Sequence, residues 1–373
     1  MTTKLSYIYT ILSLFLFIQC KQEKAKENIQ SQNTSTIKYA KGFDIVEENG
    51  NKYLLIKKVF QNEISSFKYL LSEKNDFKNN EIKVPVNRLI VTSTTHIPMI
   101  ELLGAENRII GFPNTKYISS EKTRKRIENG LVTELGSEQS MNTEILIDLV
   151  PDLVVGFSLH PNNKLYNNIK KLGFPVVFNG EWLEETPLGR AEWIKFFGVL
   201  LGKEKEAEAV FETIEKDYLA VKKIAQSVKK SPKIMSGSFF KDIWYAPAGE
   251  SFKAKFLADA NLDYLWKETS GTGSLQLNFE NVLEKAQEAE YWIGCGIHET
   301  KSQLLSTNKN FNEFTPLKTN KTYTIGAVKG KSGGIKYFEF APIRPDLILK
   351  DLIKITNPEL LPDYELSFYR LIE

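Results

Sequence analysis

The three histidines of the sequence, His96, His160 and His298, are the residues best suited to binding a metal ion. Each follows a short apolar run that predicts a strand, and open α/β sheets bind their ligands at the carboxyl ends of strands. Imidazoles from two sheets that meet there, together with Glu339, would form a site for a free divalent ion such as Zn²⁺ or Mn²⁺. The flanking loops are aromatic and rich in amides rather than acidic. They favour the alternative that the histidines contact solvent or a larger ligand, with no metal bound directly by the protein.

The same predicted loops carry aromatic, hydroxyl, amide and cationic side chains. Aromatic faces gain free energy by covering a planar ligand, and lysine or histidine can pair with its acidic groups. Any single aromatic residue is equally well explained by core packing. As a set they predict a binding surface for a large, flat or apolar solute, formed by Thr95, His96, Lys116, Tyr117, Gln139, Phe157, His160, Phe240, Trp244, Tyr245, Thr272 and Tyr337.

Motifs for catalysis or phosphate binding are absent or incomplete. Gly330-Lys331-Ser332 lacks the glycine that a phosphate-binding loop needs five positions earlier, where Ile325 stands. His298-Glu299 lacks the second histidine of a zinc-protease helix. We therefore expect a binding protein without a resident cofactor. A lipid-anchored hydrolase on the same scaffold is the weaker alternative, because no residue is marked as a nucleophile.

Composition places the chain among ordinary folded proteins. It has 373 residues, of which 42% are hydrophobic and 25% charged, and this excludes a disordered chain and a polytopic membrane protein. The length suggests about two domains. The formal net charge of +3 is too balanced for a nucleic-acid-binding protein, which would carry a concentrated basic face.

The first residues predict an export signal. Residues 5–18 are apolar and uncharged, shorter than the roughly 20 residues of a membrane-spanning helix but suitable for the core of a secretory signal. The stretch ends at Cys20, a junction that resembles a bacterial lipoprotein box, with a bulkier Gln19 before the cysteine than is usual. The resemblance implies cleavage before Cys20 and lipidation of that residue, with a plain signal peptide or a short anchor as the alternative. Residues 1–19 are thus expected to be the signal peptide, and 20–36, rich in polar residues, a flexible tether.

The rest of the chain predicts the α/β class, as two three-layer lobes with mostly parallel sheets, because short apolar runs alternate with helical stretches. The expected N-terminal lobe is 37–186, of which 37–85 is a β-rich addition, and the C-terminal lobe is 231–373. The helical segment 187–230 between them breaks the alternation. Its stretch 203–228 would form a helix of about 26 residues, roughly 39 Å long, enough to run past both lobes.

A repeated sequence pattern supports the prediction of two similar lobes. Asn142-Thr143-Glu144 opens a predicted helix that leads into a strand at Asp152, and Asn278-Phe279-Glu280 does the same before a strand near Tyr291. These two segments lie on either side of the predicted long helix in the chain. We infer a duplicated pair of lobes that face each other across one cleft.

Several blocks together resemble the substrate-binding proteins of ABC importers for iron-siderophore, haem and vitamin B12 complexes. They are the two Asn-x-Glu openings, the long helix, and the segments Val150-Pro151-Asp152-Leu153-Val154, Trp244-Tyr245, Tyr337-Phe338-Glu339 and Arg344-Pro345-Asp346. The resemblance covers about residues 86–362 and leaves the role of 37–85 open.

The resemblance implies a protein that binds its ligand in the interlobe cleft and does not catalyse a reaction. It also implies a lipid-anchored monomer at a bacterial membrane, facing the periplasm or the cell exterior, with an ABC permease and its ATPase as partners. Glu144 and Glu280 match the family's two permease-docking glutamates, although a carboxylate in the first turn is also explained by the helix dipole. The expected ligand is an iron(III)-siderophore or a related haem or corrinoid complex, with a cobalamin-specific protein as an alternative. Lys116, Lys241 and Lys336 favour an anionic chelate.

Overall fold

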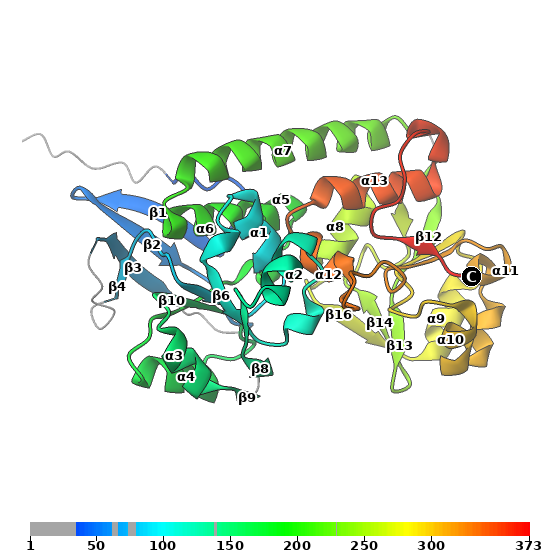
Figure 1. The fold of residues 1–373 in the computed structure, drawn as a ribbon. Helices are drawn as coiled ribbons and strands as arrows, with labels where there is room; N and C mark the ends of the chain where they lie inside the picture. Colours follow the sequence, from blue (N-terminus) through cyan, green and yellow to red (C-terminus); the bar gives the residue numbers. More distant parts are fainter. Residues whose placement is uncertain (1–34, 62–65, 74–79, 138–139, 229) are drawn as a thin grey trace, which may run out of the picture. The chain divides into compact units, whose positions relative to one another are not determined.

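The computed structural model describes residues 35–61, 66–73, 80–137, 140–228 and 230–373 (Figure 1). The predicted signal peptide, Cys20, all but the last two residues of the predicted tether, and Gln139 lie outside these residues. None of the described helices is both long and apolar enough to cross a membrane.

Lobe 1 is built on a five-stranded parallel sheet with the strand order β11-β10-β5-β6-β7. Its central strands are apolar and almost entirely buried, as expected of a parallel sheet with both faces covered. The strands are β5 (Leu89–Val91), β6 (Ile109–Phe112), β7 (Thr133–Glu134), β10 (Leu153–Gly156) and β11 (Val176–Phe178), and the helices between them are α1 (His96–Leu102), α2 (Glu121–Glu128), α3 (Thr143–Leu149) and α4 (Lys164–Lys171). The short pair β8 (Gly136–Ser137) and β9 (Ser140–Met141) lies between α2 and α3 in the chain.

Lobe 2 repeats the plan with the strand order β15-β12-β17-β18-β19, in which only the last pairing is antiparallel. A second, antiparallel sheet, β13-β14-β16, is added to it. The strands are β12 (Lys233–Met235), β13 (Ser238–Phe240), β14 (Ile243–Pro247), β15 (Asp263–Tyr264), β16 (Ser274–Leu277), β17 (Tyr291–Ile293), β18 (Thr322–Thr324) and β19 (Arg370–Leu371). The helices are α8 (Phe252–Asp259), α9 (Phe279–Ala286), α10 (Lys301–Thr307), α11 (Thr315–Lys318), α12 (Lys336–Phe340) and α13 (Pro345–Thr356).

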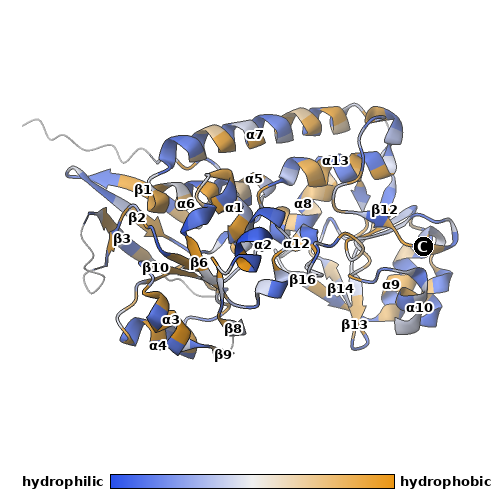
Figure 2. Cartoon of the chain, in the orientation of Figure 1, coloured by the Kyte–Doolittle hydropathy of each residue, from blue (hydrophilic) through white to orange (hydrophobic). Residues whose placement is uncertain are grey.

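Three helices connect the lobes: α5 (Pro187–Glu192), α6 (Ile194–Leu201) and α7 (Glu204–Gln226). The 23 residues of α7 span roughly 35 Å, and the helix packs against α6 near lobe 1 and against α13 of lobe 2 (Figure 1). Apolar residues recur along α7 between charged ones (Figure 2). Its buried positions are three and four residues apart, which places them on one face of the helix: Ala207, Phe211, Ile214, Tyr218, Val221 and Ala225.

The predicted β-rich addition is a four-stranded sheet in the order β1-β2-β3-β4. Its strands are β1 (Phe43–Glu48), β2 (Asn51–Ile56), β3 (Phe67–Ser72) and β4 (Glu81–Lys83). It packs on lobe 1 and the connecting helices, where the Phe43 ring lies 4.5 Å from Trp193 and the Phe60 ring 5.3 Å from Phe178, between centroids. The predicted fold class, two α/β lobes joined by one long helix with an N-terminal β-rich addition, is confirmed.

Candidate functional site

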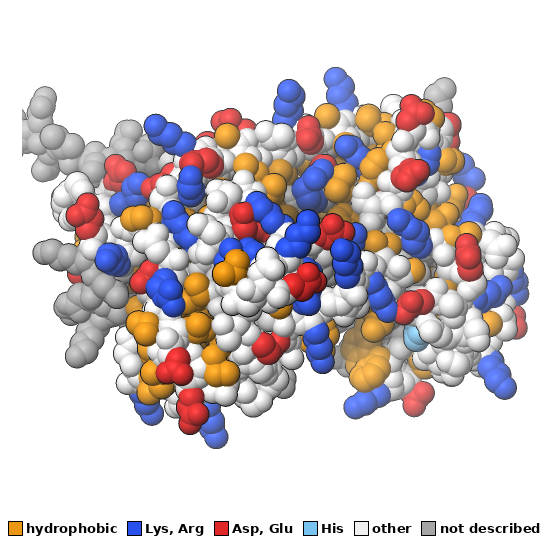
Figure 3. Space-filling model, in the orientation of Figure 1, with side chains coloured by type: hydrophobic (Ala, Val, Ile, Leu, Met, Phe, Trp, Pro, Cys, Tyr) orange, Lys and Arg blue, Asp and Glu red, His pale blue; other side chains and the backbone are white. Residues whose placement is uncertain are grey.

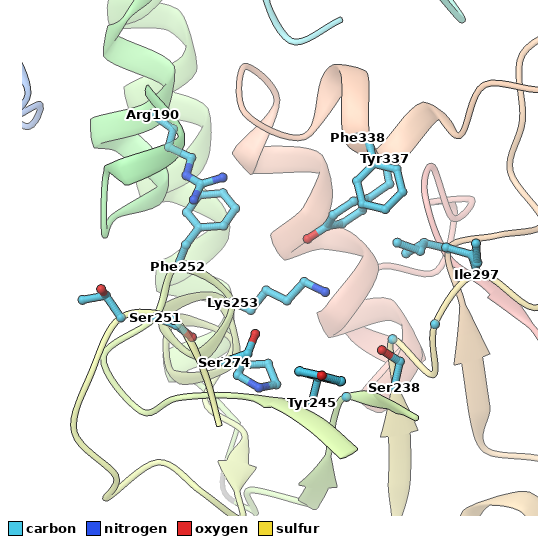
Figure 4. Close-up of a pocket in the computed structure, with 17 residues that line it drawn as sticks. Arg190, Ser238, Tyr245, Ser251, Phe252, Lys253, Ser274, Ile297, Tyr337 and Phe338 are labelled. Atoms are coloured by element: carbon cyan, nitrogen blue, oxygen red, sulfur yellow. The ribbon is translucent and has the colours of Figure 1, made fainter. Parts of the chain in front are cut away.

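Two adjoining cavities lie at the carboxyl ends of the strands. The first, here called the cationic cavity, has a volume of about 420 Å³ and is lined mainly by lobe 2 (Figure 4). Its polar lining consists of side chains from α5, α8 and its N-cap, α12, and the β13-β14-β16 sheet with the loop before β16: Arg190, Ser238, Tyr245, Ser251, Lys253, Thr272, Ser274 and Tyr337.

The second, here called the aromatic cavity, has a volume of about 440 Å³ and is formed by both lobes. Phe338 lines both cavities and therefore stands between them. In Figure 3 the lower outline of the molecule is hollowed between the two lobes. The side chains and backbone around the aromatic cavity come from Thr92, Ser93, Thr94, Phe112, Pro113, Asn114, Tyr117 and Phe157 of lobe 1 and from Gly333, Gly334, Ile335 and Phe338 of lobe 2.

Arg190 is held at the edge of the cationic cavity by the backbone. Its guanidinium donates to the carbonyl oxygens of Trp182 at 2.7 Å and Glu184 at 3.2 Å, and its Cζ lies 3.7 Å from the centre of the Phe252 ring. Burial lowers the pKa of Arg190, and the nearby Glu181 carboxyl opposes that shift. A guanidinium fixed in this way keeps its charge and is ready to pair with an anionic group.

Lys253, in the first turn of α8, supplies a second positive charge. Its side chain is open to the cavity and extends toward Tyr337 in Figure 4, with Nζ 5.9 Å from the centre of the Tyr337 ring. The surrounding protein, and after it the charge of Arg190, lower the pKa of the Lys253 ammonium group. Within the described part of the chain, neither Lys253 nor Arg190 forms an ion pair. The cavity therefore favours a ligand that brings negative charge.

The structure brings five of the predicted binding residues to the cavities. Tyr245, Thr272 and Tyr337 line the cationic cavity, and Tyr117 and Phe157 line the aromatic cavity. These residues come from both lobes, as the prediction of an interlobe site requires.

Two predicted binding residues belong to the core, and their assignment to the ligand is corrected. Trp244 is fully buried, with its ring 5.1 Å from that of Trp292, because successive residues of β14 point to opposite faces and only Tyr245 faces the cavity. His96 begins α1 and is 1% exposed, 5.3 Å from the Phe197 ring between centroids. Burial lowers its pKa to about 3, so the imidazole is neutral at physiological pH.

Four other predicted residues are not among those that line the cavities. Thr95 donates to the buried Glu181 carboxylate at 2.7 Å, and exposed Lys116 lies with Nζ 5.1 Å from the centre of the Tyr117 ring. His160 is exposed. Phe240 is 60% exposed at the tip of the β13–β14 hairpin.

The histidines do not form a metal site. His96 is enclosed in the core, and His298 is half-buried, with its Nε2 3.4 Å from the Thr307 hydroxyl. No three histidine, cysteine or carboxylate side chains of the described residues are placed to hold a metal ion. This geometry contradicts the interpretation of a free-ion receptor that uses His96, His160 and His298.

Sequence reasoning did not single out Arg190 and Lys253, which line the cationic cavity. Arg190 lies in the helical connector, where a charged residue is usually interpreted as solvent-exposed. Lys253 and Lys255 are both exposed lysines of the predicted helix 252–260, and only the fold shows that Lys253 is the one that lines the cavity.

The two predicted docking residues occupy matching places in the two lobes. Glu144 in α3 and Glu280 in α9 are exposed second residues of helices whose N-caps are Asn142 and Asn278. Each asparagine side chain accepts a backbone N–H of the first turn, which fixes the start of its helix. In Figure 1 both helices lie on the side of the molecule away from α7.

Comparison with known proteins agrees with this architecture. The protein family described as periplasmic binding protein matches residues 89–328. An uncharacterised lipoprotein of Methanocaldococcus jannaschii is 28% identical over 372 residues, which cover 90% of this chain and 85% of that protein.

Solved structures share the fold at low sequence identity. A possible iron-binding periplasmic solute-binding protein of Staphylococcus epidermidis has a TM-score of 0.58 at 16% identity, over 73% of this chain and 99% of its own. A periplasmic heme-binding protein of Pseudomonas aeruginosa has a TM-score of 0.58 at 14% identity, over 77% and 98%. With the family match covering more than half of the sequence, the chain belongs to the periplasmic binding proteins, the solute-binding components of ABC importers.

Proposed function

We propose that this protein captures an anionic iron(III) chelate, such as a ferric siderophore, in the interlobe cleft and delivers it to an ABC permease and its ATPase. The observation that carries the proposal is the pair of cations, Arg190 and Lys253, which line the cationic cavity and, among the described residues, form no ion pair, although Glu181 and Glu184 act on Arg190 from a greater distance. Iron(III) bound by catecholate or carboxylate groups commonly carries net negative charge. Charge-assisted hydrogen bonds from a guanidinium and an ammonium group are the strong ones in a protein site.

The aromatic cavity accounts for the rest of such a ligand. Phe112, Tyr117 and Phe157 form an apolar wall, and Phe338 is shared with the cationic cavity. A chelate with aromatic arms would cover these rings while its charged centre faces Arg190 and Lys253. The solved neighbours include iron-binding and heme-binding proteins, which are consistent with this class of ligand.

Delivery requires a membrane location and a docking surface. We propose that Cys20 carries the lipid anchor, which keeps the monomer close to its permease and raises its effective concentration there. The relative from Methanocaldococcus jannaschii is itself named a lipoprotein. Glu144 and Glu280, exposed on the same side of the two lobes, would contact basic residues of the permease.

Titration of tryptophan fluorescence tests the ligand class. The probes are ferric tris-catecholate, haem, cobalamin, Zn²⁺ and Mn²⁺, and Trp182, whose ring lies 5.6 Å from that of Phe157 between centroids, is a natural reporter. We expect saturable binding of the anionic ferric complex. Lys253→Gln should weaken it about 10- to 100-fold, the size expected for a hydrogen bond to a charged group.

Lys255→Gln is the matched control, because Lys255 is exposed on the same helix and does not line the cavity. Its affinity should equal that of the wild type. Binding of cobalamin or of a free metal ion, with none of an anionic ferric complex, would reject the proposed ligand. An identical affinity in Lys253→Gln and the wild type would reject the role of the cation pair.

A further inference from the structure

One buried carboxylate joins the two lobes directly. Glu339, on α12 of lobe 2, is 1% exposed, and its two oxygens accept the backbone N–H groups of Ser119 and Ser120 in lobe 1. The Oε1–N distance to Ser120 is 2.9 Å, and both serines are themselves buried. Since two hydrogen bonds to a carboxylate oxygen pair are strong and directional, this contact fixes the position of α12 relative to the start of α2.

The contact has the form of a helix cap supplied by the other lobe. Ser120 is the N-cap of α2 and accepts the N–H of Thr123 at 3.2 Å. In the usual capping box, the third helical residue is a glutamate or glutamine that reaches back to the N–H of the N-cap. Here that residue is Thr123, and Glu339 supplies the missing carboxylate from lobe 2. The start of α2 is therefore complete only when the lobes are in contact.

A glycine-rich loop brings the backbones together beside this carboxylate. A Cβ on Gly334 would lie 2.2 Å from the carbonyl oxygen of Tyr117, and a Cβ on Gly330 would lie 2.7 Å from Cα of Ser119. Between these glycines, Ser332 donates its hydroxyl to the carbonyl oxygen of Ile118 at 2.9 Å. The loop that the sequence offered as an incomplete phosphate-binding motif is thus an interlobe contact.

We propose that Glu339 is a positioning residue that clasps the two lobes and sets the width of the cleft between Tyr117 and Phe338. Tyr117 lies two residues before Ser119, which the carboxylate holds, and Phe338 directly precedes Glu339 in the chain. Both aromatic side chains line the aromatic cavity, so any loosening of the clasp moves one wall of that cavity relative to the other. The effect of this contact on ligand binding rests on the proposed function, whereas the contact between Glu339 and lobe 1 does not depend on it.

The clasp depends on the protonation state of Glu339. Desolvation by burial raises the pKa of Glu339 to about 7, the charge of Glu101 on α1 adds to the rise, and the N–H groups of Ser119 and Ser120 oppose it. Glu101 is itself held by the hydroxyl groups of Ser120 and Thr123. Opening of the lobes would expose this carboxyl to water and return its pKa to the usual, lower range, so the closed state binds the proton more tightly than the open one. The clasp should therefore be favoured below the raised pKa and weaken as the pH rises through it.

Distances between spin labels test the clasp without a ligand. Asn168→Cys in α4 and Ser302→Cys in α10 place one label on an exposed site of each lobe, in a full chain that carries Cys20→Ser and keeps the buried Cys295. We expect a narrow distance distribution at about pH 6 and a broader one, shifted to longer distances, at about pH 8, one unit on each side of the pKa. Glu339→Gln should give the same distribution at both pH values, because the amide cannot ionise.

The control is Glu299→Gln, which removes an exposed carboxylate before α10 that pairs with Lys329, also of lobe 2, and does not bridge the lobes. It should keep the pH response of the wild type. Ser332→Ala, a milder change, should broaden the distribution at about pH 6 and serves if Glu339→Gln does not fold. A distribution in Glu339→Gln or Ser332→Ala that matches the wild type at both pH values would overturn the proposal. Ligand titration of the same variants is a separate measurement, so failure of the ligand assignment would leave the clasp result intact.

Discussion

In lobe 1, β6 ends at the aromatic Phe112 and β10 is followed directly by Phe157, whereas in lobe 2 β17 is followed by Gly294, and the small residue Ser238 begins β13. The small residues leave room above the sheet of lobe 2. That room is where Lys253 of α8 and Arg190 of the connector meet the cavity (Figure 4). The same scaffold therefore yields an apolar wall in one lobe and a charged wall in the other, and the difference lies in loops and helix starts rather than in the sheets.

The largest expected effect comes from removing the charged wall. Arg190→Gln combined with Lys253→Gln leaves the cationic cavity without either of its positive charges. We expect the affinity for ferric tris-catecholate, measured by fluorescence titration, to fall about 100-fold or more, because two charge-assisted contacts are lost. The conservative pair Arg190→Lys with Lys253→Arg keeps the charge and should retain most of the binding.

Thermal unfolding of both double variants separates binding from folding, since Arg190 also holds the carbonyl groups of Trp182 and Glu184. If the neutral and the charge-conserving variants are both folded and bind with equal affinity, the positive charge of the cationic cavity does not determine which ligand binds.

The lobes also differ on the side proposed to face the permease. In α3 and its C-cap, Glu144 shares the surface with Ile147 and Val150, which are 41% and 61% exposed. In α9 the exposed surface beside Glu280 carries Glu284 and Lys285, and the exposed Glu288 follows the helix. The matching glutamates thus stand in an apolar setting in lobe 1 and a charged setting in lobe 2. An interface with lobe 2 should therefore be the more sensitive to salt.

We predict that Glu144→Ala with Glu280→Ala lowers the ATP hydrolysis stimulated by this protein in reconstituted membranes about 10-fold, the effect of losing contacts worth about 1.4 kcal/mol in total. Ligand affinity should not change, because neither residue lines a cavity. Glu212→Ala, at an exposed position on α7, is the control and should leave the stimulation unchanged. Full stimulation of ATP hydrolysis by the double variant would contradict the docking role of both glutamates.

Much of the scaffold follows from the sequence. The positions of α7 that face the core, from Ala207 to Ala225, recur at three and four residues, and this period is visible without coordinates. The helix starts at Asn142 and Asn278 are equally legible, because asparagine followed by a polar first turn is a local signal. Local patterns predict local structure, and the duplicated order of these patterns predicts the two lobes.

The cleft was less predictable, because its lining depends on which way each side chain points. Trp244 and Tyr245 are adjacent aromatic residues, yet the alternation of β14 buries the first in the core and turns the second to the cavity. His96 follows a strand end, as a ligand-binding residue should, but its ring packs on Phe197 of the connector. Arg190 shows the opposite case, since its place at the cavity arises only when the connector folds against lobe 2.

The smallest expected effect comes from the apolar wall of lobe 1, and it tests whether that wall recognises the aromatic part of the ligand. Tyr117 is 54% exposed in the aromatic cavity, so Tyr117→Ala should be tolerated by the fold while it removes aromatic surface from the ligand's path. We expect the affinity for ferric tris-catecholate to fall about fivefold, in line with roughly 1 kcal/mol for an aromatic pair, and the affinity for ferric citrate, an anionic chelate without rings, to change little. Tyr117→Phe keeps the ring and should behave as the wild type with both probes. If Tyr117→Ala weakened the binding of the two chelates equally, the apolar wall would act through the shape of the cleft. The aromatic and the cationic cavity would then not recognise separate parts of the ligand.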